Sequence, residues 1–81
     1  MESLEYTIER LLMFAGHDPI QVQCTLDYEV IVEYKDMLEA VQAAKVLYGS
    51  GIFSTLELEY LEGYKTTLIR CYVNVGADRW A

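Results

Sequence analysis

The stretch IQVQCTLDYEVIVEY (residues 20–34) alternates apolar and polar side chains over fifteen positions. This alternation and the many β-branched residues are typical of a β-strand with one buried face. The even-numbered set is expected to face a core: Ile20, Val22, Cys24, Leu26, Tyr28, Val30, Val32 and Tyr34. The odd-numbered set is expected to face the other side: Gln21, Gln23, Thr25, Asp27, Glu29, Ile31 and Glu33.

This stretch is longer than an ordinary strand, which has about 5–6 residues. No Gly, Pro or Asn interrupts it, and a turn would be expected to disturb the parity. The pattern therefore predicts one long, strongly twisted or bent strand. The alternative is a break near Asp27–Glu29 that divides the stretch into two strands, and it stays open at this point.

Two helices flank this stretch. Residues 3–15 are expected to be helical, with Ser3 as N-cap, Gly16 just after the last turn and Pro19 preventing continuation. Its apolar residues recur with helical spacing: Leu4, Ile8, Leu11, Leu12 and Ala15. A second helix is predicted from Asp36 to about Tyr48, ended by GSG at 49–51.

The segment STLELEYLEGYKTTLIRCYVNVG (residues 54–76) predicts a hairpin around Glu62–Gly63, where Gly63 supplies a positive φ. That loop opposes Leu61 with Tyr64 and Leu58 with Thr67. One face then carries an apolar set: Leu56, Leu58, Tyr60, Ile69, Cys71, Val73 and Val75. The other carries Glu57, Glu59, Leu61, Tyr64, Thr66, Leu68, Arg70, Tyr72 and Asn74.

The expected order of elements is therefore α-β-α-β-β, in one α+β domain spanning residues 1–81. We predict a two-layer sandwich in which both helices cover one face of a three-stranded antiparallel sheet. The sheet order is 2-3-1, with the last strand between the other two. Trp80 either packs against an edge of the core or is exposed.

The composition limits the function. The 81 residues include 13 acidic and 6 basic side chains, for a net charge of −7, which disfavours binding to nucleic acid or to anionic membranes. No apolar run approaches the ~20 residues of a membrane span, and the N-terminus MESLEYTIERLL lacks a basic region of a signal peptide. The expected compartment is the cytoplasm.

Little in the sequence favours catalysis. Cys24 and Cys71 are expected to be buried thiols, with a redox pair as the alternative. His17 is the only histidine, and no further ligands complete a metal site beside it. No nucleophile stands with a base on one expected surface. We therefore predict a protein that is not an enzyme and that uses neither a cofactor nor a metal.

The uncovered sheet face is the candidate partner-binding surface, since it mixes carboxylates with tyrosines and aliphatic side chains. Its candidate residues are Asp27, Glu29, Ile31, Glu33, Glu57, Glu59, Tyr64, Leu68, Arg70 and Tyr72. The alternative interpretation is an ordinary solvated face.

The leading functional hypothesis is a small acidic inhibitor that binds a protein partner. By analogy at the level of class, phages and mobile elements carry such proteins against basic nucleic-acid-binding complexes of the host. Imitation of DNA is a second version, although one row of carboxylates, about 6.6–6.8 Å apart, has only half the charge density of a DNA strand. The alternative function is a self-assembling subunit that forms a homodimer through the open face.

Overall fold

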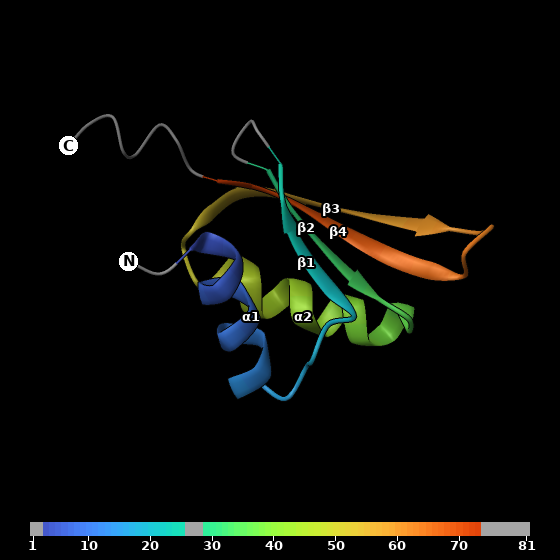
Figure 1. Ribbon diagram of the computed structural model, residues 1–81, viewed down its shortest axis with the longest axis horizontal. Helices are drawn as coiled ribbons and strands as arrows, with labels where there is room; N and C mark the ends of the chain where they lie inside the picture. The colour runs from blue at the N-terminus through green and yellow to red at the C-terminus, as the bar shows by residue number, and fades with distance from the viewer. Residues whose placement is uncertain (1–2, 26–28, 74–81) are drawn as a thin grey trace.

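The chain forms two helices on one side of a four-stranded antiparallel sheet, in a computed structural model that describes residues 3–25 and 29–73 (Figure 1). The elements, in chain order, are α1 (Leu4–Phe14), β1 (Gln21–Cys24), β2 (Glu29–Tyr34), α2 (Met37–Gly49), β3 (Phe53–Leu61) and β4 (Thr66–Val73). The sheet order is β1-β2-β4-β3. Asp27 and Trp80 lie outside the described residues.

The prediction of a three-stranded sheet in the order 2-3-1 is wrong, and so is the element order α-β-α-β-β. The alternating stretch forms two antiparallel strands, β1 and β2, as in the alternative with a break near Asp27–Glu29. Each β1 residue faces a β2 residue of the same parity, as in Gln21 opposite Glu33 and Cys24 opposite Val30. The same parity therefore marks the same face in β1 and in β2, which is why parity alone did not reveal that the stretch forms two strands.

Both predicted helix N-caps are confirmed. The Ser3 hydroxyl accepts a hydrogen bond from the Tyr6 amide at 3.1 Å, and the Asp36 carboxylate accepts one from the Leu38 amide at 3.3 Å. Each satisfies a donor that has no partner within the helix. Gly16, just after α1, has a φ of +85°, which suits glycine at a helix C-terminus.

The core lies between the helices and the sheet. Small residues on α2, Ala40 and Ala43, let that helix approach the strands closely. The fully buried side chains of the core are Ile8, Leu12, Val30, Val32, Ala40, Ala43, Leu47, Ile69 and Cys71. Tyr34 is also buried, and its hydroxyl donates to the His17 carbonyl at 2.5 Å, which ties the segment after α1 to the end of β2.

The hairpin between β3 and β4 differs from the prediction. Leu61 pairs with Thr66, so the loop contains four residues, 62–65, instead of Glu62 and Gly63 alone. The residue with positive φ is Lys65, at 56°, and its amide donates to the Leu61 carbonyl at 2.7 Å. The register moves by two residues, which keeps every side chain on its expected face.

The helices do not cover the whole helix-side face of the sheet. Leu58 and Tyr60, which were expected in the core, are each 47% exposed. Both belong to β3, at the edge of the sheet, and the β3–β4 hairpin extends beyond the helices (Figure 1). The prediction that this part of the face is sealed is therefore wrong.

Candidate protein-binding face

The open face is the side of the sheet opposite the helices. Residues paired across antiparallel strands lie on the same face, so the register shows which of the candidates meet. Its pairs are Glu29–Tyr72, Ile31–Arg70, Glu33–Leu68, Glu57–Arg70 and Glu59–Leu68. The structure thus brings all described candidates from the strands onto one surface. Tyr64 belongs to the hairpin loop, and Asp27 lies outside the described residues.

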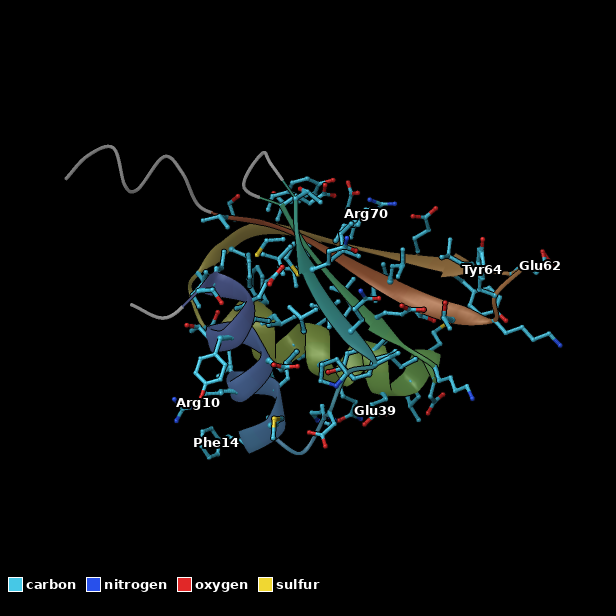
Figure 2. All side chains as sticks on the ribbon, viewed as in Figure 1. Arg10, Phe14, Glu39, Glu62, Tyr64 and Arg70 are labelled. Carbon is cyan, nitrogen blue, oxygen red and sulfur yellow. The ribbon has the colours of Figure 1, made fainter. Side chains whose placement is uncertain are left out.

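Arg70 lies at the centre of this face, on the side away from the helices (Figure 2). Its Nη1 is 3.3 Å from Oε2 of Glu29, and its Nη2 is 3.0 Å from Oε1 of Glu59. Hydrogen bonds to Glu59 and Glu29 raise the pKa of the guanidinium above its ordinary value. The single guanidinium charge is therefore shared between two of the candidate carboxylates and offsets one of their two negative charges, which interrupts the acidic row.

Tyr72 lies next to this ion-paired cluster, directly opposite Glu29. Partial desolvation and the charges of Glu29 and Glu57 raise the pKa of its phenol. The phenol therefore stays protonated through the physiological range and adds no negative charge to the face.

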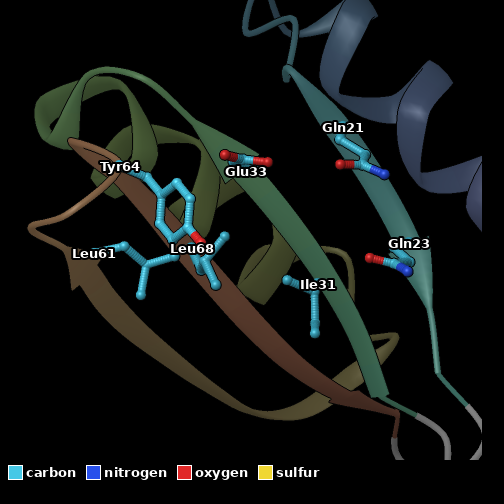
Figure 3. A pocket seen from close by; sticks show the side chains of 7 residues that line it. All are labelled: Gln21, Gln23, Ile31, Glu33, Leu61, Tyr64 and Leu68. Atoms are coloured by element: carbon cyan, nitrogen blue, oxygen red, sulfur yellow. The ribbon is translucent and has the colours of Figure 1, made fainter.

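A hollow of about 270 Å³ lies beside the Arg70 cluster. Its apolar residues are Ile31, Leu61, Tyr64 and Leu68, and its polar ones are Gln21, Gln23 and Glu33 (Figure 3). Tyr64 is 78% exposed, and its ring lies over the hollow next to Leu68 (Figure 3). An apolar depression with a polar border can receive one or two side chains of another protein.

Three of these lining residues, Gln21, Gln23 and Leu61, were expected on the open face but were not among the candidates. The glutamines reach the hollow because β1 folds back beside β2, with Gln23 opposite Ile31. A single long strand would have carried them far from Leu68. The division of the stretch into β1 and β2 therefore has to be known before the hollow can be found.

The thiols and the histidine offer little chemistry. Cys24 and Cys71 both pair with Val30, one on each side, which places their Cα atoms about 10 Å apart, too far for a disulfide. Burial and the charge of Glu29 raise the pKa of Cys71 to about 12. His17 Nδ1 is 3.8 Å from the Glu39 carboxylate. Within residues 3–25 and 29–73, no group of three or more His, Cys, Asp or Glu side chains could hold a metal ion.

Neither helix in the described part of the chain has the length and apolar character needed to cross a membrane. In comparisons with known proteins, no protein-family model, no curated protein and no solved structure matches this chain. The open face is therefore the feature of this chain that indicates a function.

Proposed function

We propose that the protein is a non-catalytic protein-binding domain that contacts its partner through the open face. The hollow formed by Ile31, Leu61, Tyr64 and Leu68 carries this proposal. These side chains gain nothing from contact with water, whereas burial of an apolar side chain under a partner contributes about 1.5–3 kcal/mol. An apolar centre within a polar rim is the arrangement found in protein interfaces.

The charge indicates the class of partner. The chain has a net charge of −7, and Glu33 and Glu57 add carboxylates beside the hollow and the Arg70 cluster. A basic protein surface complements this field and would associate faster at low salt. An inhibitor that covers the basic surface of a nucleic-acid-binding protein is the specific form of this proposal.

The Arg70 ion pairs weigh against close imitation of DNA. A DNA strand presents an unbroken series of phosphates, whereas Arg70 places a cation between Glu29 and Glu59. Recognition is therefore expected to depend on the apolar hollow, with the carboxylates steering the encounter.

The test is affinity capture by three immobilised forms: the wild type, Leu68→Asp and Phe14→Asp. Leu68 lines the hollow, and Phe14 is 80% exposed on α1, away from the sheet (Figure 2). We expect a basic protein that the wild type and Phe14→Asp retain and that Leu68→Asp loses at least tenfold, measured again with the purified partner. Equal retention by all three forms, or capture by none, would overturn the proposal.

Self-assembly through the same hollow is the second candidate, and the apolar lining favours it as well. Face-to-face contact between two copies would, however, bring Glu33 and Glu57 close to the carboxylates of the other copy. Light scattering across a concentration series separates the two candidates. If the protein forms a dimer and Leu68→Asp dissociates it, the occupant of the hollow is a second copy of this chain and not a basic partner.

A further inference from the structure

The two edges of the sheet are protected differently. β1 has four residues, and the Glu5 carboxylate of α1 accepts a hydrogen bond from the Cys24 amide at 2.8 Å. β3 has nine residues, and no described element pairs with its outer side. A long unpaired edge strand is a template for a further strand.

The outward backbone groups of β3 follow from the hairpin. The Leu61 carbonyl accepts hydrogen bonds from Tyr64 and Lys65, at 3.1 and 2.7 Å, so it points toward β4. Successive residues of an antiparallel strand direct their backbone groups alternately to the two sides. The N–H and C=O groups of Tyr60, Leu58 and Leu56 therefore point away from β4, toward the open edge.

The side chains of the same three residues point toward the helix side of the sheet. There a groove of about 400 Å³ separates β3 from α2. Its lining residues are Val41, Ala44, Lys45, Tyr48, Gly49, Leu56 and Leu58. Tyr48 is 68% exposed and Leu58 is 47% exposed, so the apolar surface of the groove is accessible along the edge.

The opposite face of β3 is acidic. Glu57 and Glu59 are both exposed on that face. They alternate along the strand with Leu56, Leu58 and Tyr60, whose side chains lie on the helix side. A strand added at this edge would place every second side chain over the groove and the others beside the carboxylates.

We propose that the β3 edge binds an extended segment of a protein partner in which basic and apolar residues alternate. The segment adds a strand to the sheet through the outward groups of Leu56, Leu58 and Tyr60. Its apolar side chains enter the groove, and its Lys or Arg side chains meet Glu57 and Glu59. Glu57 and Glu59 belong to the open face as well, but the groove and the open-face hollow share no lining residue, so the inference does not depend on the hollow.

A second copy of the chain fits this edge poorly. Antiparallel pairing of two β3 strands about Leu58 would set Glu57 of one copy directly opposite Glu59 of the other. Like charges placed directly opposite each other destabilise a strand pair, and each copy has a net charge of −7. A basic segment turns the same carboxylates into favourable contacts.

The experiment uses two fluorescein-labelled peptides in anisotropy titrations at low and at physiological salt. One alternates, Lys-Val-Lys-Val-Lys-Val, and the other has the same composition in blocks, Lys-Lys-Lys-Val-Val-Val. We expect the alternating peptide to bind at least about tenfold more tightly, a difference of about 1.4 kcal/mol. It should also slow hydrogen exchange at the amides of Leu56 and Leu58.

Three variants locate the binding site. Leu58→Pro removes an amide that points away from β4, and edge strands tolerate proline at such a position. This change is expected to weaken binding at least tenfold. Tyr48→Ala, on the exposed side of α2, tests the groove without altering β3 and should weaken binding severalfold. Tyr64→Ala alters the hollow without adding a charge beside Glu59 and should leave peptide binding unchanged, which separates this edge from the hollow.

Equal affinity for the two peptides, no measurable binding of the alternating one, or unchanged affinity in Tyr48→Ala and in folded Leu58→Pro would overturn the inference. Slowed exchange on β1 instead of β3 would do the same. Dimerisation of the free protein that Leu58→Pro abolishes would identify a second copy as the occupant and would equally exclude the basic segment.

Discussion

Replacing Arg70 with Gln is the most direct test of the site's electrostatics. The guanidinium contacts Glu59, whose side chain is 49% exposed, and Glu29, whose side chain is 18% exposed. An exposed ion pair contributes about 0.2–1 kcal/mol. A hydrogen bond to a more buried charged group contributes up to about 1.5–3 kcal/mol, which partial exposure reduces. We therefore expect Arg70→Gln to lower the free energy of unfolding by about 1–2 kcal/mol.

The measurement is urea denaturation followed by far-UV circular dichroism, since urea does not screen charges. A double-mutant cycle with Glu29→Gln should give a coupling energy of about 1 kcal/mol, because removing both partners leaves no unpaired charge. Glu57→Gln is the matched control: Glu57 lies opposite Arg70 in the register, but the guanidinium forms its ion pairs with Glu29 and Glu59. A coupling energy with Glu29 no larger than with Glu57 would refute this account.

Three further predictions concern stability. Thr67→Val should raise the free energy of unfolding by about 1 kcal/mol, because the Thr67 hydroxyl is buried without a hydrogen-bond partner among the described residues. In thermal unfolding the same change at the exposed Thr55 should have little effect, and equal shifts would contradict this reasoning. Lys65→Gly should raise the urea midpoint, because glycine adopts the φ of 56° at this position without strain. The expected gain in the free energy of unfolding is about 0.5–1 kcal/mol, and Lys65→Ala should not reproduce it. Cys71 has an ordinary pKa of 9.0, raised to about 12 in the fold, so the folded state keeps this proton longer and stability falls by up to about 1.4 kcal/mol per pH unit above pH 9. Cys71→Ala should show a shallower alkaline loss in a pH series of urea denaturations, and parallel profiles would exclude this cause.

The helices were predictable because their ends are decided by local chemistry. Ser3 and Asp36 each accept a hydrogen bond from an amide two or three residues later. Residues of these types just before a helical pattern predict such a bond from the sequence alone. The hairpin loop was not predictable in the same way. Gly63 is the residue best suited to a positive φ, yet the fold gives that conformation to Lys65, because the strand register decides the length of the loop.

The open face was partly predictable for the same reason that the division into β1 and β2 was missed. Side-chain parity assigns residues to a face whether the stretch forms one strand or two, so Glu29 and Ile31 were placed together with Leu68 and Arg70 in advance. Parity carries no information about which residues are neighbours across strands. The ion pair between Glu29 and Arg70 and the approach of Gln23 to Ile31 depend on the register, which only the fold supplies.

β3 and β4 connect the two proposed surfaces, and this connection has a thermodynamic consequence. Glu59 forms an ion pair with Arg70 on the open face, while its neighbour Leu58 lines the groove on the helix side. A domain of this size has a thin margin of stability, and its half-exposed Leu58 and Tyr60 contribute less burial than core residues do. A ligand that binds the folded state alone stabilises it by mass action, by about 2.7 kcal/mol at a hundredfold excess over Kd. A partner that occupies either surface should therefore raise the unfolding temperature of the whole sheet. A partner that contacts both surfaces should raise it further than a partner that contacts only one.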